Sequence, residues 1–316
     1  MEPLISVIIP TFNRASIIGS TINSIINQTY QNWECIIIDD LSRDYTYELI
    51  QFYAEKDSRI IYFKRPQNWQ KGANSCRNYG LDKSSGVYVN WFDSDDIMDR
   101  EFLDLKYRFI TKSNCDFIVS KTMFHDGGAY RNIDYGLTKQ KILLGNFILG
   151  KQICLTPDLF CKSETLQNIR WNHNLKSGQE FNFVSKYLAT GVKGRYLERL
   201  LTTANTQYES IHSKQINDEK ARIKNKYKCY ILTLVDLSKI GCKNQYYETV
   251  QNHLLRLSVS YAFQLAVKRI YIPYYVDLAK ILFRYNGFKK FLTFNLSLFI
   301  AYCNGRGYQL MDKSRN

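Results

Sequence analysis

Acidic residues gather at one point of the chain, where Asp93-Ser94-Asp95-Asp96 directly follow the apolar segment VYVNWF. Three carboxylates within four residues repel one another, and a bound cation relieves that repulsion. Hard divalent ions such as Mg²⁺ and Mn²⁺ take oxygen ligands and pair with phosphate groups. The segment therefore predicts a metal and phosphate site, with an acidic turn that caps the next helix as the alternative.

Two other apolar segments also end in polar side chains. LISVII at 4–9 precedes Pro10-Thr11-Phe12-Asn13, and WECIII at 33–38 precedes Asp39-Asp40. Such runs are typical of buried strands, and segments 59–63, 87–92 and 116–120 have the same character. Parallel sheets bind ligands outside the carboxyl ends of their strands. We therefore expect the three polar strand ends to meet at one site.

Segments of helical character separate these strands, at 15–28, 45–55, 73–83 and 100–111. The third of them ends near Ser84-Ser85-Gly86, where a glycine suits a helix C-terminus. Strand and helix in alternation predict parallel βαβ units with right-handed crossovers. The expected fold class is therefore α/β.

The remaining sequence is less regular. Residues 121–213 mix strand-like pieces at 153–161 and 194–200 with a helix expected at 179–189. Residues 214–316 are mainly helical in pattern, as at 221–237 and 248–267, and Pro273 breaks that pattern. We expect a catalytic domain at 1–213 and a helical region at 214–316.

Charge is distributed unevenly between these two parts. The net charge is +14, and residues 214–316 hold 18 Lys or Arg against 6 Asp or Glu. Residues 1–213 are therefore close to neutral. A basic region favours an anionic partner such as a membrane face, a phosphorylated lipid or nucleic acid. A solvated, lysine-rich helical surface is the alternative.

Several classes of protein lack their sequence signals. The eight cysteines contain no CxxC pair, so a zinc site has no support, and free thiols suit a reducing cytosol. The chain shows no P-loop, no G-x-G-x-x-G and no G-x-S-x-G motif. We expect neither a signal peptide nor a membrane-spanning helix, and segment 291–303 is expected to be a core or interfacial helix.

Four segments together resemble family 2 glycosyltransferases of the bacterial surface-polysaccharide type: SVIIPTFNR, NSIINQTYQNWECIIIDDLSRD, GANSCRNYGLDKSSGVYVNWFDSDD and SGQEFNF. The resemblance covers about residues 4–212. It implies the GT-A fold, which is Rossmann-like with a mainly parallel central sheet flanked by helices, here followed by a C-terminal helical extension.

The resemblance also implies roles for the acidic segment. Asp93-Ser94-Asp95 is similar to the family's DxD motif, with Asp95 as the main ligand of Mn²⁺ or Mg²⁺. Asp93 would face the ribose or the water shell of the metal, and Asp96 also borders the site. His212 lies where several members have a histidine that reaches the metal or the pyrophosphate, although a lone histidine is more often structural.

The resemblance also implies which residues bind the nucleotide. Pro10, Thr11, Phe12 and Asn13 stand where the family cradles the base, and Phe12 offers a face for stacking. Asp39 and Asp40 match an acidic pair, of which Asp40 is expected to bind the base or ribose. Arg77 either approaches the donor or forms a salt bridge with nearby carboxylates, and both readings stay open.

Gln179-Glu180 stand where the family usually has Glu-Asp, whose second residue is the catalytic base. Glu180 still supplies the carboxylate that can remove a proton from an acceptor hydroxyl. The alternative is a glutamate that the helix dipole favours in a first turn.

The resemblance implies an inverting, metal-dependent glycosyltransferase. Family frequency favours a UDP-sugar donor, and the basic, aromatic-rich C-terminal region favours a lipid-linked or cell-surface glycan acceptor. The expected location is cytoplasmic, with peripheral contact at the inner face of an anionic membrane. The alternatives are an inactive nucleotide-sugar-binding relative and a nucleic-acid-binding protein. No nucleic acid is expected, because the acidic strand ends lie in the near-neutral part.

Overall fold

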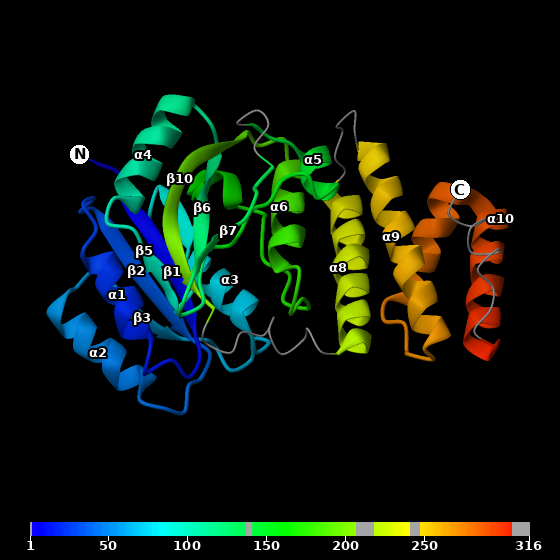
Figure 1. The fold of residues 1–316 in the computed structure, drawn as a ribbon, viewed down its shortest axis with the longest axis horizontal. Coiled ribbons are helices and arrows are strands. Elements are labelled where there is room, and N and C mark those ends of the chain that lie inside the picture. Colours follow the sequence, from blue (N-terminus) through cyan, green and yellow to red (C-terminus); the bar gives the residue numbers. More distant parts are fainter. Residues whose placement is uncertain (1, 137–140, 207–217, 241–246, 305–316) are drawn as a thin grey trace. The chain divides into compact units, whose positions relative to one another are not determined.

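The computed structural model describes residues 2–136, 141–206, 218–240 and 247–304 (Figure 1). The chain divides into two compact units. The first is Met1–Asn174 with Gly191–Glu209, and the second is Leu175–Thr190 with Ser210–Asn316. The predicted boundary near 213 falls outside the described residues and stays a prediction. The segment around 179–189, which we expected in the first domain, belongs to the second unit.

A mixed sheet forms the centre of the first unit, in the order β3-β2-β1-β4-β9-β6-β10-β5, with β7 beside β6 and β8 beside β10. Its strands are β1 (Ile5–Thr11), β2 (Trp33–Asp39), β3 (Ile60–Lys64), β4 (Tyr88–Trp91), β5 (Asp96–Met98), β6 (Phe117–His125), β7 (Tyr130–Asn132), β8 (Lys141–Ile142), β9 (Leu159–Lys162) and β10 (Gly194–Asn205).

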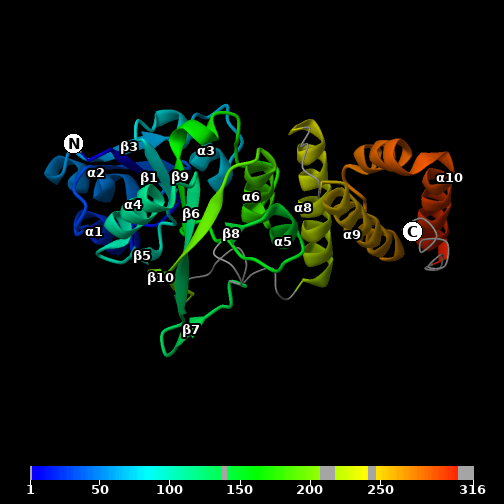
Figure 2. The same ribbon diagram turned by 90° about the horizontal axis from the view of Figure 1, so that it is seen from above.

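Strands β1 to β4 pair in parallel, as do β6 and β10, whereas β9 runs antiparallel to both of its neighbours. The predicted parallel α/β sheet is therefore confirmed. The prediction of a strand over 153–161 was too long, because residues 153–155 are irregular, residues 156–158 form a turn, and the strand is Leu159–Lys162. Figure 2 shows the β6–β7 hairpin projecting beyond the rest of the sheet.

Helices cover both faces of this sheet. They are α1 (Ile18–Ile26), α2 (Thr46–Lys56), α3 (Ala73–Lys83), α4 (Phe102–Ser113), the short α5 (Leu144–Ile148) and the 3₁₀ turn Ser163–Leu166. Side chains of α1, α2 and α4 share one apolar core with Ile5, Val7 and Ile9 of β1. Cys76 of α3 packs with Ile36 and Ile38 of β2. The alternation of side chains along a strand thus places α3 on the opposite face.

Gly86 was predicted to suit the C-terminus of α3, and this prediction was wrong. Helix α3 ends at Lys83, and its C-cap residue Ser84 is extended. Gly86 instead donates its N–H to Ser6 Oγ at 2.8 Å. A Cβ on Gly86 would lie 2.5 Å from that oxygen. Close approach to β1, rather than a left-handed cap, therefore explains the glycine.

The second unit is helical and consists of α6 (Gln179–Ala189), α8 (Glu219–Ile240), α9 (Tyr247–Val267) and α10 (Tyr275–Asn304). Helix α6 packs against α8, α8 against α9, and α9 against α10 (Figures 1 and 2). Pro273 lies between α9 and α10, as the broken pattern predicted. Within the described part of the chain, no helix combines the length and apolar character that a bilayer crossing requires.

Cysteines behave as small apolar residues in most places. Six of those described are buried, and Cys303 is exposed. All seven described cysteines are free thiols. The expectation that cysteines in apolar runs are buried is confirmed for Cys35 in β2, which is fully buried.

Candidate active site

The carboxyl ends of β1, β2 and β4 meet at one edge of the sheet. Thr11 is the register partner of Asp39, and Trp91 at the end of β4 is the partner of Ile8. Asp40 donates its backbone N–H to the carbonyl of Thr11 at 2.8 Å. Parallel pairing therefore brings the three polar strand ends to a common edge, as the sequence predicted.

The acidic segment faces two arginines from earlier elements. Arg77 of α3 lies 2.8 Å from Asp93, and Arg14 lies 3.5 Å from Asp95. Ser94 and Asp96 are buried, and Asp96 opens β5, which pairs with β10. Sequence reasoning missed Arg14, although it directly follows the expected base cradle.

Negative charge at this edge is only partly compensated. Burial raises the pKa of Asp95, the neighbouring charge of Asp93 raises it further, and Arg14 offsets part of the shift. Burial raises the pKa of Asp96 well above its usual value, with added repulsion from Asp93, Asp95 and Asp158. Carboxylates that repel one another in a partly dry site favour a bound cation.

The residues present fit a divalent cation that the protein holds through few ligands. Among the described residues, no group of three or more His, Cys, Asp or Glu side chains converges as a metal-binding cluster. Mg²⁺ is often bound by one or two carboxylates, with substrate phosphates and water completing its shell. Asp95 and Asp93 match that pattern, and His212 lies outside the described residues.

The cradle predicted for the base follows β1. Thr11 is buried, and its hydroxyl has no hydrogen-bond partner among the described residues. Phe12 is 38% exposed, and the ammonium of Lys71 lies 3.9 Å from the centre of its ring. A buried hydroxyl without a partner beside an exposed ring suits a polar, aromatic ligand. Lys71 carries no local sequence signal and was missed.

Local hydrogen bonds fix the shape of this cradle. Asn13 has a φ of 52°, in the left-handed region. Its backbone N–H donates to Ser42 Oγ at 2.8 Å, and its side-chain oxygen accepts from the N–H of Arg43 at 2.9 Å. The loops after β1 and β2 are therefore tied together. Pro10 lies inside β1, one residue before the loop.

Asp39 and Asp40 occupy different surroundings. Asp39 accepts hydrogen bonds from the backbone and hydroxyl of Ser42 and from the Tyr62 hydroxyl, the last at 3.0 Å. Asp40 forms a buried ion pair with Arg65. Asp39 thus shapes the loop that follows β2. Asp40 as the ligand of the base or ribose stays a prediction, and Arg65 was not singled out from the sequence.

The sequence left two interpretations of Arg77 open, an approach to the donor or a salt bridge with nearby carboxylates. The salt bridge to a carboxylate is present, since Arg77 pairs with Asp93. A second guanidinium nitrogen donates to Asn74 Oδ1 at 3.1 Å. These contacts hold the guanidinium at the acidic strand end, and approach to a donor stays a prediction.

Glu180 belongs to the second unit, where it lies in the first turn of α6 and is partly buried. Gly178, with a φ of 69°, precedes the helix. A carboxylate in the first turn is favoured by the helix dipole whatever its further role. The predicted helix bounds are confirmed, and the role as a base stays a prediction.

Comparisons with known proteins agree with this fold. Residues 6–164 match the family described as Glycosyl transferase family 2. An uncharacterized glycosyltransferase of Rickettsia bellii is 42% identical over 56% of this chain and 25% of its own length. The Escherichia coli UDP-Glc:alpha-D-GlcNAc-diphosphoundecaprenol beta-1,3-glucosyltransferase WfgD is 31% identical over 48% of this chain and 53% of its own.

Two solved structures resemble the chain along nearly its full length. S. aureus TarS 1–349 in complex with UDP-GlcNAc has a TM-score of 0.68 at 18% identity, covering 98% of this chain and 89% of that one. The mannosyltransferase PcManGT of Pyrobaculum calidifontis, in complex with GDP-Man and Mn²⁺, has a TM-score of 0.54 at 14% identity, covering 95% and 86%.

The mainly parallel sheet with its polar strand ends defines an α/β protein of the GT-A class. Within that class, the match over half of the sequence places the chain in glycosyl transferase family 2.

Proposed function

We propose that the protein is an inverting, metal-dependent glycosyltransferase that moves a hexosyl group from a nucleotide-sugar to a hydroxyl group. The observation that carries this proposal is the convergence of three polar strand ends, with partly uncompensated carboxylates beside a cradle for an aromatic base. Family membership supports the reaction class.

The donor is proposed to be a UDP-sugar. Phe12 would stack on the base. The Thr11 hydroxyl, which has no partner within the described part of the chain, would accept a hydrogen bond from the base or donate one to it. Asp40 would bind the base or ribose, and Arg77 would approach the diphosphate. The fold shared with a protein that binds UDP-GlcNAc supports this choice.

The chemistry divides between the two ends of the reacting bond. A divalent cation held at Asp95 would supply positive charge for the diphosphate leaving group. Glu180 accepts the proton of the acceptor hydroxyl, whose oxygen attacks the anomeric carbon from the face opposite the leaving group. The new carbon–oxygen bond forms as the bond to the diphosphate breaks. This route inverts the configuration.

The acceptor is proposed to be a lipid-linked or cell-surface glycan, reached at the inner face of the cell membrane. Relatives such as WfgD, named for a diphosphoundecaprenol acceptor, support this class. Helix α10 exposes Leu292, Leu296 and Phe299 at helical spacing. Lys280 and Arg284 of the same helix are also exposed. Apolar and basic side chains together suit an anionic bilayer surface.

A catalytically inactive relative that binds nucleotide-sugar is the second candidate. The Gln179-Glu180 pair departs from the family's usual Glu-Asp, and this departure is the observation that favours it. Turnover separates the two candidates, because both would bind the donor.

The decisive experiment measures nucleotide release from UDP-, GDP- and dTDP-sugars, with Mn²⁺ or with EDTA. We expect metal-dependent release from one donor class, reduced at least about a hundredfold in Asp95→Ala and about a hundredfold to ten-thousandfold, to a measurable residual rate, in Glu180→Gln. The matched control is Asp82→Ala, which removes a surface carboxylate that pairs with Arg170, and this variant should retain activity. Binding of UDP without turnover would favour the inactive relative. Calorimetry that shows no Mn²⁺-dependent UDP binding would refute the proposed site.

A further inference from the structure

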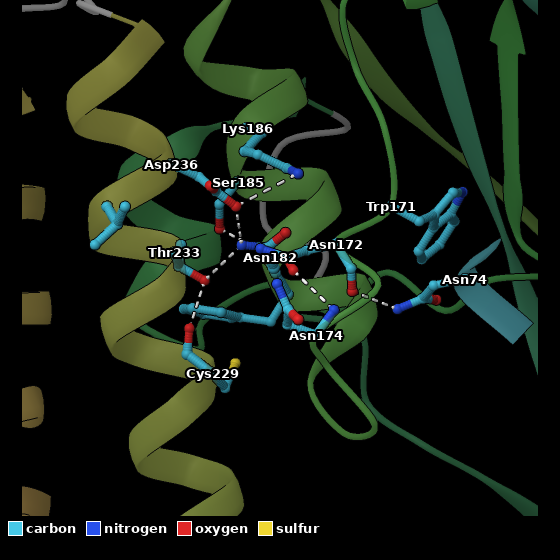
Figure 3. A network of polar contacts seen from close by, with 12 residues as sticks. Asn74, Trp171, Asn172, Asn174, Asn182, Ser185, Lys186, Cys229, Thr233 and Asp236 are labelled. Carbon is cyan, nitrogen blue, oxygen red and sulfur yellow. Dashed lines mark hydrogen bonds and ion pairs between the residues drawn. The ribbon is translucent and has the colours of Figure 1, made fainter. Parts of the chain in front are cut away.

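Helix α6, which carries Glu180, is attached to α8 along one side. Within the second unit, Gly178, Asn182 and Lys186 of the α6 segment face Cys229, Thr233 and Asp236 of α8 (Figure 3). The first series rises in steps of four residues and the second in steps of four and then three, so the two helices run in parallel with matching faces. Helix α8 lies outside the segment matched to the family.

A close contact between the two helices lies at Gly178, two residues before Glu180. A Cβ on Gly178 would clash with the sulfur of Cys229 and would lie 3.0 Å from its Cβ. The Cys229 thiol donates to the carbonyl of Gly178 at 3.5 Å, and the backbone N–H of Asn182 donates to the same oxygen at 3.1 Å. The start of α6 therefore cannot move toward α8.

A buried polar network fixes the rotation of α6. Asn182 is fully buried, and its amide group donates to Thr233 Oγ1 at 3.2 Å and to Asp236 Oδ2 at 3.0 Å. One turn further along, the ammonium of Lys186 lies 3.6 Å from the same Asp236 oxygen. Buried groups that lose such partners keep their desolvation cost, so rotation of α6 is opposed.

An aromatic contact supports the same arrangement from the other side of Asn182. Phe181 meets Tyr230 of α8 edge to face, with ring centroids 5.7 Å apart, and Tyr230 in turn packs against Tyr261 of α9. Burial, and to a smaller extent the charge of Glu180, raise the pKa of the Cys229 thiol to about 12. Gly178, Phe181 and Asn182, which lie on either side of Glu180 in the sequence, thus all contact α8.

We propose that α8 is a positioning element for the catalytic base, with Cys229, Asn182 and Asp236 as positioning residues that set the place and rotation of Glu180. This inference rests on the proposed role of Glu180. It makes the helical region a part of the catalytic machinery rather than an appendage for membrane contact alone.

The test compares two changes at Cys229 in the full chain, with nucleotide release from the hydrolysed donor and Mn²⁺ as the assay. Cys229→Leu adds carbon atoms where Gly178 leaves no room, so we expect kcat to fall on the order of tenfold to a hundredfold. The KM for the donor and the affinity for UDP should stay within about twofold. Cys229→Ala should lose less than about threefold, and Lys224→Leu, at an exposed position of α8, is the control.

A double-mutant cycle separates positioning from a general structural role. In the Glu180→Gln background, Cys229→Leu should lower the residual rate no further, because the group it displaces is already gone. A further loss as large as that in the unmodified protein would overturn the inference. An unchanged kcat in a Cys229→Leu variant that unfolds at the normal temperature and binds UDP would also overturn the inference.

Two outcomes distinguish this inference from the proposed function. If Glu180→Gln loses most of its turnover while folded Cys229→Leu keeps its kcat, only the positioning role fails. If Glu180→Gln retains full turnover, the proposed base fails and the positioning role with it. Should Cys229→Leu not fold, Asp236→Asn replaces it, with Glu219→Gln of the same helix as its control. An unchanged kcat in Asp236→Asn then counts against α8.

Discussion

Asp158 shows how a single buried group can influence the acidic edge. Its side chain is fully buried and accepts hydrogen bonds from Tyr135 at 2.6 Å and Thr122 at 2.8 Å. Its backbone carbonyl accepts from the buried ammonium of Lys106 at 3.0 Å. Burial raises the pKa of Asp158 to about 6, although Lys106 and the hydroxyl donors lower it. The carboxylate contributes in turn to the raised pKa of Asp96.

The raised pKa of Asp158 predicts a pH-dependent contribution to stability. The folded protein holds an extra proton between the ordinary pKa, near 4, and about 6. The stabilisation is therefore complete below about pH 4 and is lost as the pH rises through 6. Relative to Asp158→Asn, which has no carboxyl group to titrate, the unmodified protein should lose at most about 3 kcal/mol across this window.

Denaturant unfolding of both proteins at pH 4, 5, 6 and 7 checks this prediction. Asp158→Asn is expected to be less stable throughout, because an amide replaces one hydrogen-bond acceptor with a donor. The informative quantity is how the difference in free energy of unfolding between the two proteins changes with pH. If this difference is constant from pH 4 to 7, or if it grows in favour of the unmodified protein as the pH rises, the result contradicts the raised pKa of Asp158.

At the scale of elements, close approach decides how the helices sit on the sheet. Gly80 of α3 faces β1, and a Cβ there would clash with Ile8 and lie 3.3 Å from a side-chain carbon of Ile38. The same helix carries Arg77 to the acidic strand end. Packing of α3 at Gly80 therefore helps to set the position of that guanidinium.

Gly80→Ala should destabilise the protein by about 1–3 kcal/mol, because the added methyl group overpacks a closed contact. Gly145→Ala is the matched control, since Gly145 lies in α5 and no atom of the described residues would lie within 4 Å of its Cβ. Alanine there should be neutral or slightly stabilising. Chemical denaturation of the two variants measures the difference in their free energies of unfolding. Equal values would show that α3 accommodates the added methyl group without loss of stability.

At the scale of the whole molecule, most of the net charge belongs to residues 214–316. The near-neutral remainder holds the acidic strand ends and the proposed donor site. Residues 214–316 can therefore attract an anionic surface through their positive charge. The near-neutral remainder carries little net negative charge that would repel a negatively charged donor. Membrane contact is thus compatible with the proposed reaction.

Sedimentation with vesicles tests membrane contact. We expect binding to vesicles that contain anionic phosphatidylglycerol, weaker binding at high salt, and little binding to phosphatidylcholine alone. Replacement of Leu292, Leu296 and Phe299 by serine should weaken binding about tenfold or more. Phe52→Ser removes a 50% exposed ring from α2 and should have no effect. Equal binding to both lipids would argue against the basic region as the cause.

Much of the first unit could be predicted from local pattern. The strands up to residue 120 lie within two residues of their expected starts, and α3 and α6 have the expected bounds. Short pieces were missed, among them β5 at Asp96–Met98, which begins within the acidic segment and pairs with β10. Such a strand depends on a distant partner and has no periodicity of its own to reveal it.

The sequence by itself determined the α/β class, the acidic strand end and the place of the polar loop after β1, because each depends on neighbouring residues and on the period of a strand or helix. Only the tertiary structure decided the partners of those groups. Arg65 meets Asp40 from 25 residues away, and Cys229 meets Gly178 from 51 residues away. Contacts of this kind follow from how the elements pack, and spacing along the chain does not encode them.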